Sequence, residues 1–584
     1  MPKRGCIAWS LVILASVGCG SSGGARTDAG VKDASQSGTG GSSGSGGKGG
    51  SGGKGGSSGG GTGGSAASGS GGKGGSGGKG GSGGQGGDTA AGGGGGSGGE
   101  AGEPAPDTSA SVLERNKHAS RDGHFLQPTL TKANVMKFAS DSDFKANFDG
   151  NMWASPLYLE NGPNDKGVFF AATTSNDVLA LDETTGSTVW KHHIGDSPTA
   201  NGVDCGNIHP LGILSTPVID ADARTIFVAG AIGTNEISRH ELHALSVDDG
   251  AEKPNWPLNI SSLKAGSLSF NTPAQNQRSA LSLVKGNVFV AYGGHVGDCD
   301  DYHGWVIGVD SKDPSKNAAW ATLGVGEAIW AAGGMASDGN SIFAVTGNNT
   351  RRVSNRANTD SEEVVRLSGL AQFERDNKNL YFPASWRTMD STDADFGASN
   401  PIYMRIPGST PEHFVLAIAK DGHLYLLDPN NLGGMAGHVL DFMVSTDEMS
   451  VRTVPAVYTT DQGVYVVFST LQTALCPQGG AAGGARIMAV RFAAGAPPTA
   501  EVAWCAGFSG GETSPIATTT DGKKDPIVWI MDGGELRAMD GDTGATIYSS
   551  TETCSGVRKW TSPIAVKGRI VAGGDKHLCS WSAH

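Results

Sequence analysis

The chain has 584 residues and a formal net charge of −13. Most of its 94 glycines lie between Gly20 and Gly102, in a segment with too little apolar surface to offset the entropy of folding. That segment is close to neutral, so the acidity belongs to the rest of the chain, which has no basic run to neutralise phosphates. The composition therefore argues against a nucleic-acid-binding protein.

The first 19 residues have the pattern of an export signal. Lys3 and Arg4 precede an apolar run, Ile7–Val17, which is too short to span a bilayer and is typical of a cleaved signal peptide. The run leads through SVG into Cys19 and resembles a bacterial lipobox. This resemblance implies a lipidated Cys19, and Gly20 after it favours the outer membrane. Ordinary signal cleavage before an incidental cysteine is the alternative.

The Gly/Ser-rich composition of residues 20–107 predicts a disordered tether, and residues 108–584 are expected to form the folded domain. A random-coil tether of this length has a root-mean-square reach of roughly 50 Å. It would keep the domain near a membrane without fixing its orientation.

A four-residue signature recurs eight times along the domain, at intervals of 48 to 68 residues. Each copy usually leads into a short apolar run, and one or two further short strands follow, as at 167–173 and 177–181. Turns with Asp or Ser and Gly close some of these units. The copies begin at Trp153, Leu214, Arg278, Trp330, Ala398, Arg452, Glu512 and Trp560.

This period predicts an all-β domain, an eight-bladed β-propeller of four-stranded blades. The last repeat supplies only about three strands. We therefore expect Ala133–Ala139, just after the tether, to add the fourth strand and close the ring. No helix longer than a couple of turns is expected.

The segment Ala180–Trp190 fits the pattern A-x-D-x-x-T-G-x-x-x-W in full and resembles the blade ending of pyrroloquinoline-quinone-type (PQQ-like) propeller repeats. The chain is also similar to a subgroup of secreted propeller proteins without a settled activity, and it shares several sequence blocks with them. These blocks are Gly212–Asp220, Gln275–Arg278, Tyr302–Val306, Lys420–Asp428 and Asp525–Trp529. The resemblance runs from about Thr129 to the C-terminus and implies the propeller fold.

The broader class includes quinoprotein dehydrogenases, which carry an adjacent Cys-Cys pair over PQQ, carboxylate and Asn ligands for Ca²⁺, and often a C-x-x-C-H haem motif. This chain has neither adjacent cysteines nor C-x-x-C-H. The stretch from Asp540 begins like a calcium loop, but Thr551 stands where the bidentate Glu belongs, which favours a structural turn. Carboxylates that could serve as Ca²⁺ ligands are Glu512, Asp300, Asp301 and Asp395.

Six cysteines lie in the predicted domain, and an even number in an exported chain indicates disulfide bonds. Spacing alone does not select a pairing. We predict Cys476–Cys505 within one blade and Cys554–Cys579 between neighbouring blades, which leaves Cys205–Cys299.

The sequence HVGDCDDYH holds the densest group of potential metal ligands: His295, Asp300 and His303. Two imidazoles and a carboxylate can hold a divalent metal. The alternative, which we favour, is a loop fixed by a disulfide, with His303 hydrogen-bonded beside Trp305.

The first strand of each propeller blade starts beside the central channel, so the eight residues that begin the signatures should surround one mouth of it. We call them the mouth residues. Six of them form a candidate ligand-binding site, in which indoles stack on a sugar and guanidinium groups bind an acid: Trp153, Arg278, Trp330, Arg452, Glu512 and Trp560. The alternative is that they plug the channel, with Glu512 paired to an arginine.

The leading hypothesis is a non-catalytic, membrane-tethered lipoprotein whose propeller binds a small molecule or glycan, or scaffolds a protein partner. It rests on the mouth residues and on analogy with scaffolding propellers. One rival is a PQQ-dependent oxidoreductase. The other is a polysaccharide lyase or hydrolase acting at the mouth, although the chain has no G-x-S-x-G nucleophile elbow.

Overall fold

The computed structural model describes residues 107–583, apart from 352–356, 447–450, 472–473, 478–485 and 510–511. The predicted signal peptide, Cys19 and almost all of the predicted tether lie outside the described residues. No helix among the described residues is long and apolar enough to cross a bilayer.

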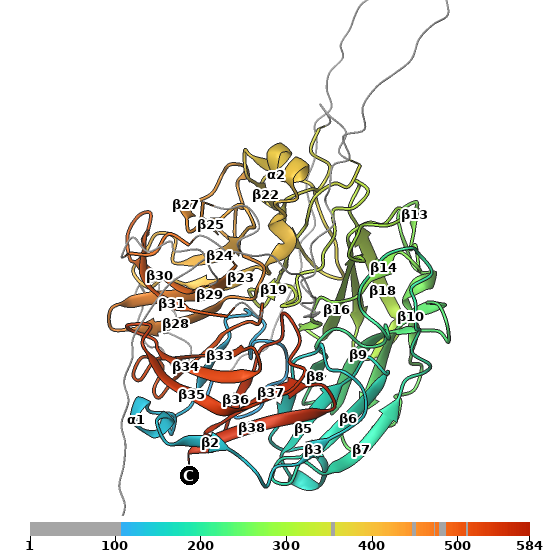
Figure 1. Ribbon diagram of the computed structural model, residues 1–584. Helices are drawn as coiled ribbons and strands as arrows, with labels where there is room; N and C mark the ends of the chain where they lie inside the picture. Colours follow the sequence, from blue (N-terminus) through green and yellow to red (C-terminus); the bar gives the residue numbers. More distant parts are fainter. Residues whose placement is uncertain are drawn as a thin grey trace, which may run out of the picture. The chain divides into compact units, whose positions relative to one another are not determined.

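The described residues form the predicted eight-bladed propeller of four-stranded antiparallel blades (Figure 1). Blades 1 and 2 are β4 (Leu157–Leu159), β5 (Val168–Ala172), β6 (Asp177–Asp182) and β7 (Thr188–His193), then β8 (Val218–Asp220), β9 (Thr225–Ile232), β10 (Arg239–Ser246) and β11 (Leu258–Asn259). Blades 3 and 4 are β15 (Ser282–Val284), β16 (Asn287–Gly294), β17 (Trp305–Asp310) and β18 (Asp313–Ala321), then β19 (Ala336–Ser337), β20 (Ile342–Val345), β21 (Val364–Leu367) and β22 (Leu380–Phe382).

Blades 5 and 6 are β23 (Ile402–Arg405), β24 (His413–Ile418), β25 (His423–Leu427) and β27 (Leu440–Met443), then β28 (Ala456–Thr460), β29 (Gly463–Thr470), β30 (Arg486–Ala493) and β31 (Thr499–Gly507). Blade 7 is β32 (Ile516–Thr519), β33 (Ile527–Asp532), β34 (Glu535–Asp540) and β35 (Thr546–Thr553). Blade 8 is β36 (Ile564–Val566), β37 (Arg569–Gly574), β38 (His577–Ala583) and β2 (Phe138–Ser140).

Several short strands and helices lie outside the four-stranded blades. Strand β14 (Gln275–Asn276) pairs with β16, β26 (Gly434–Met435) pairs with β22, and β12 (Lys264–Ala265) and β13 (Leu268–Ser269) form a separate hairpin. The described α-helices are α1 (Lys132–Val135) and α2 (Trp386–Thr392), and 3₁₀ turns lie at Pro163–Asp165, Ile260–Ser262 and Phe396–Ala398.

The inner strands are buried because neighbouring blades cover both of their faces. Every residue of β5 and β9 is buried, so these strands are apolar runs without alternation, whereas β7, at the outside of blade 1, is largely exposed. Tryptophans pack between blades: the Trp190 indole donates a 2.9 Å hydrogen bond to the Val247 carbonyl of blade 2. Gly250 has a φ of +72°, and an added Cβ would lie 2.6 Å from the Trp190 ring, so this turn requires glycine.

An N-terminal strand closes the ring as predicted, but its position differs from the prediction. Residues 133–135, expected as part of this strand, belong instead to helix α1 (Lys132–Val135), because the Thr131 side chain caps the Asn134 amide. Strand β2 begins at Phe138 and pairs antiparallel with β38, as Figure 1 shows near the C-terminus, and β3 (Ala146–Asn147) pairs further along β38.

Residues 107–131, which we call the plug segment (blue in Figure 1), contact all eight blades at the centre of the ring. The sequence did not predict this. Its hydrogen bonds with blades 1 and 2 join Val112 to Tyr158 and Leu113 to Ile219. Those with blades 4 to 7 join Ala119 to Ser337, Ser120 to Tyr403, Asp122 to Val457 and Gly123 to Ala517. Gln127 reaches blade 8 through Ala565 and Gly568, and Arg121 reaches blade 3.

The plug segment binds here because the innermost strand of each blade is an edge strand, whose unpaired backbone groups face the channel and need partners. Strand β1 (His124–Leu126) pairs with β32 in parallel. Arg121, fully buried, donates to the carbonyls of Arg115, Leu281 and Met335, to the Ser282 hydroxyl, and to Glu114 at 3.0 Å.

The three predicted disulfides, Cys205–Cys299, Cys476–Cys505 and Cys554–Cys579, are all present. Cys505 lies within strand β31, opposite Met488 of β30. The turn interpretation of Asp540 is confirmed, since its carboxylate accepts hydrogen bonds from the amides of Asp542 and Thr543.

Candidate ligand-binding mouth

The mouth residues lie next to the plug segment. Each precedes, by a few residues, a residue that the plug segment contacts, as Trp153 precedes Tyr158 and Glu512 precedes Ala517. The two layers are joined, because the guanidinium of Arg115 donates a short hydrogen bond to the Trp560 carbonyl. The mouth therefore has a floor, and the channel behind it is filled by the chain's own N-terminal segment.

Three indoles and one guanidinium lie close together at the mouth. The Arg278 guanidinium carbon lies 4.9 Å from the ring centroid of Trp330 and 5.0 Å from that of Trp560. The Trp560 ring lies 5.9 Å from that of Trp153, at an interplanar angle of 41°. Arg278 is 8% exposed, and the three tryptophans are partly exposed. The N–H donors of a guanidinium lie in its own plane, so contact with aromatic rings above or below that plane does not block them. A planar acceptor such as a carboxylate can bind such a guanidinium with two hydrogen bonds.

Glu512 is paired, as the plug alternative predicted. One carboxylate oxygen lies 3.7 Å from Nη1 of Arg452, and the other lies 2.6 Å from Nζ of Lys559. The Glu512 side chain is buried, whereas 20% of Arg452 and 44% of Lys559 are exposed. The mouth thus has a feature of each alternative. The charge of Glu512 is balanced by Arg452 and Lys559, as in a plug, whereas Arg278 lies against indoles, as in a ligand-binding site.

Two mouth residues adopt left-handed backbone conformations. The φ angles are +53° at Glu512 and +64° at Trp560, and the Trp560 amide donates a 2.7 Å hydrogen bond to the Glu512 carbonyl. Such conformations are uncommon for side chains of this size and cost on the order of 1–3 kcal/mol each. They hold these two side chains in an orientation that ordinary backbone geometry would not give.

The other mouth residues have packing roles. Leu214 and Ala398 are buried, and Leu214 belongs to a small apolar cluster against which Trp153 packs.

Three basic residues of the mouth were not predicted. Nζ of Lys420 lies 5.6 Å from the Trp330 ring centroid and 2.6 Å from the Asp395 carboxylate. The Arg558 guanidinium lies 5.7 Å from the Trp153 ring and pairs with Asp575 through both carboxylate oxygens. Arg558 and Lys559 directly precede Trp560 in the sequence. This position beside a mouth residue was the only sign in the sequence that they could belong to the mouth.

Blade 4 buries a pair of carboxyl groups that share one cation. Arg375 donates to both Asp360 and Glu363, whose side chains are 1% and 0% exposed. Burial raises the pKa of Glu363 to about 8 and that of Asp360 to about 7. The Asp360 carboxylate raises the pKa of Glu363 further, and Glu327 raises that of Asp360.

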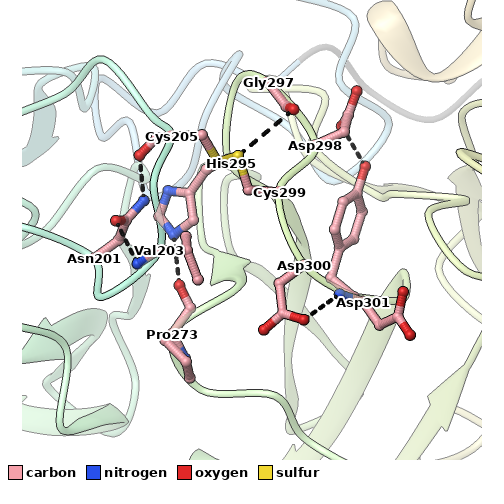
Figure 2. The surroundings of a disulfide bond; sticks show 11 residues. Asn201, Val203, Cys205, Pro273, His295, Gly297, Asp298, Cys299, Asp300 and Asp301 are labelled. Carbon is pink, nitrogen blue, oxygen red and sulfur yellow. Dashed lines mark hydrogen bonds between the residues drawn. A yellow bond between two sulfur atoms is a disulfide. The ribbon is translucent and has the colours of Figure 1, made fainter.

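The candidate metal ligands of the HVGDCDDYH loop do not converge. In Figure 2 the His295 ring points at the Pro273 carbonyl, 3.2 Å away, rather than at Asp300. His303 donates a 2.9 Å hydrogen bond to the Thr322 carbonyl, and Asp300 accepts from Asn271 at 3.3 Å. Within the described part of the chain, these three residues do not bring their ligand atoms together. The loop is instead fixed by the Cys205–Cys299 disulfide, as the favoured alternative stated.

Comparison with known proteins places the fold and nothing finer. No described protein family and no curated protein matches the chain. Among solved structures, a quinohemoprotein alcohol dehydrogenase from Pseudomonas putida HK5 is 13% identical, with a TM-score of 0.58, over 81% of this chain and 80% of that one. The quinohemoprotein alcohol dehydrogenase from Comamonas testosteroni is 14% identical, with a TM-score of 0.58 over the same shares. A europium-containing methanol dehydrogenase is 13% identical, with a TM-score of 0.55, over 80% of this chain and 90% of that one.

These neighbours define the class of fold: the eight-bladed propeller of this chain is similar to that of the three dehydrogenases. At this identity they show the fold alone, which hosts many unrelated functions.

The mouth does not fit a quinone, the group named in two of these neighbours. The six cysteines of the propeller form three disulfides between residues far apart in sequence, so an adjacent Cys-Cys pair is missing. The Arg278 guanidinium lies over both the Trp330 ring and the Trp560 ring, so it occupies ring surface on which a planar quinone could otherwise stack.

The candidate Ca²⁺ ligands are engaged as well. Glu512 is bound by Lys559, Asp301 by Arg351, Asp395 by Lys420, and Asp300 accepts from the Asn271 amide. We therefore derive no chemistry through either group.

Proposed function

We propose that this protein is an exported, membrane-tethered lipoprotein whose propeller is a non-catalytic module that binds a small carboxylated ligand, such as an acidic sugar, at the mouth. The export signal, the lipobox-like run into Cys19 and the three disulfides, which persist in oxidising compartments, support the tethered location.

One observation carries the binding proposal: the Arg278 guanidinium held between the indoles of Trp330 and Trp560, with Trp153 beside them. Buried channel positions are ordinarily filled with aliphatic side chains, which need no strained backbone. Here a guanidinium can bind a carboxylate with two hydrogen bonds, while the partly exposed Trp153 ring offers a face for a sugar ring. The floor formed by the plug segment favours a ligand that docks at the mouth rather than one that passes through the channel.

Binding by calorimetry to trigalacturonate, with neutral galactotriose as the matched ligand, tests this proposal. We expect Arg278→Met to weaken trigalacturonate binding about 10- to 150-fold, the equivalent of about 1.5–3 kcal/mol for a hydrogen bond to a charged group. Arg224→Met, which removes a surface guanidinium paired with Asp248, is the control and should bind as the wild type does.

Equal affinity for the neutral trisaccharide, or unchanged binding by Arg278→Met, would contradict the proposal. Cleavage of the trisaccharide during the titration would favour the polysaccharide lyase or hydrolase alternative instead.

A further inference from the structure

The Cys554–Cys579 disulfide lies beside an imidazole at the junction of blades 7 and 8. Cys554 directly follows strand β35, and His577 and Cys579 are alternate residues of β38, so their side chains share one face of that strand. The Cys554 Sγ and the His577 Nε2 are 3.7 Å apart, and the potential ligand atoms of all three residues lie within 4.8 Å of one another.

The orientation of His577 is set by its other nitrogen. Nδ1 lies 2.8 Å from the Asp575 carbonyl, which can only accept, so Nδ1 carries the proton and Nε2 presents a lone pair toward Cys554. Metal-binding histidines are oriented by this same kind of outer hydrogen bond. A disulfide sulfur has no proton to donate to that lone pair, whereas a thiol does.

The backbone of Gly574 lies against the two ligand atoms. A Cβ on Gly574 would lie 3.1 Å from the Cys554 Sγ and 3.2 Å from the His577 Nε2, so a glycine keeps the two atoms uncovered. A cavity of about 200 Å³ is lined by two of the three residues, His577 and Cys579, together with Asp141, Lys145 and Glu552.

We infer that Cys554, Cys579 and His577 form a thiolate–imidazole site for Zn²⁺ or another thiophilic metal ion when their disulfide is reduced. A dithiol reductant gives two electrons and two protons to the disulfide, yielding two cysteine thiols and the cyclic disulfide of the reductant. The metal ion then replaces the two thiol protons, which are released to water, and His577 donates its Nε2 lone pair.

The geometry matches this site closely. Zinc bonds of about 2.3 Å to sulfur and about 2.05 Å to nitrogen, at a tetrahedral angle, place those two ligand atoms about 3.6 Å apart. The Cys554 Sγ to His577 Nε2 distance is already 3.7 Å. The two sulfurs must separate to about 3.8 Å once their bond is reduced, and Cys579 lines a cavity.

A cobalt titration of the reduced full chain tests this inference. The chain is reduced with tris(carboxyethyl)phosphine, which becomes the phosphine oxide, and Co²⁺ is added while sulfur-to-cobalt charge-transfer absorption is followed. We expect one equivalent of Co²⁺ to bind. Cys554→Ser with Cys579→Ser should abolish the signal. His577→Ala should weaken binding at least about tenfold, since even outer-shell partners contribute that much.

The matched control is Cys476→Ser with Cys505→Ser, which removes a different disulfide and should leave the signal unchanged. Circular dichroism of the reduced wild type must retain its β-sheet spectrum. The inference is overturned if no charge-transfer band forms, if the band persists without Cys554 and Cys579, or if reduction unfolds the domain.

Discussion

Replacing Arg121 with methionine tests whether the plug segment is an integral part of the propeller. Methionine keeps much of the apolar stem of arginine but removes the donors that reach Arg115, Leu281, Met335 and Ser282. It also leaves Glu114, whose side chain is 12% exposed, without its partner at 3.0 Å.

The expected loss is large because the charge is fully buried. Removing one partner of a buried ion pair costs about 3–5 kcal/mol, and each carbonyl left without a donor adds roughly 1 kcal/mol or more. We therefore expect the Arg121→Met variant to lose about 4 kcal/mol or more of unfolding free energy at pH 8. Burial raises the pKa of Glu114 and Arg121 lowers it, so removing Arg121 raises that pKa further. Protonation of Glu114 should make the loss smaller at pH 5 than at pH 8.

Urea unfolding followed by tryptophan fluorescence measures this loss as the shift of the midpoint at constant slope. Arg224→Met is the control, because Arg224 pairs with Asp248 at the surface, where 37% and 46% of the two side chains are exposed. A surface pair contributes about 1 kcal/mol or less. If Arg121→Met costs no more than Arg224→Met, the plug segment does not fill the channel as described.

Three further predictions concern other parts of the chain. Cys19→Ser should release the protein from the membrane fraction on fractionation, and continued sedimentation with membranes would refute lipidation at that cysteine. Because the pKa of Glu363 is raised to about 8, its stabilising contribution is complete below its unfolded pKa of about 4.5 and is lost as pH rises through 8. Glu363→Gln should therefore flatten the fall in melting temperature between pH 5 and pH 8.5, and an unchanged profile would contradict this assignment. Phe138→Pro, within the closing strand β2, should lower the melting temperature by disrupting the β2–β38 ladder, whereas a surface change such as Met136→Ser should leave it nearly unchanged.

The propeller could be predicted from the sequence because the same four-residue signature recurs in every blade, followed by short apolar strands, and similar turns close some of the blades. The disulfide pairs followed from that placement of the blades. The first residue of the closing strand could not be predicted from the sequence. Thr131 caps a short helical turn, and the apolar pattern of Ala133–Ala139 does not distinguish such a turn from a strand.

The plug segment was missed for a physical reason. It has no repeat and little apolar periodicity, and its partners are backbone groups on eight blades spread over the whole domain. At the mouth, the repeat position identified the indoles and arginines, but their pairing depends on residues outside the repeat signature. Lys420 and Lys559 are such residues, and only the fold brings them beside Trp330 and Glu512.

A crystal structure of the protein soaked with trigalacturonate tests the central claim, binding at the mouth, most directly. We predict a carboxylate within hydrogen-bonding distance of the Arg278 guanidinium and a sugar ring against the Trp153 or Trp560 indole. A mouth without ligand, at a concentration that saturates binding in solution, would contradict the claim, as would a ligand bound elsewhere on the propeller.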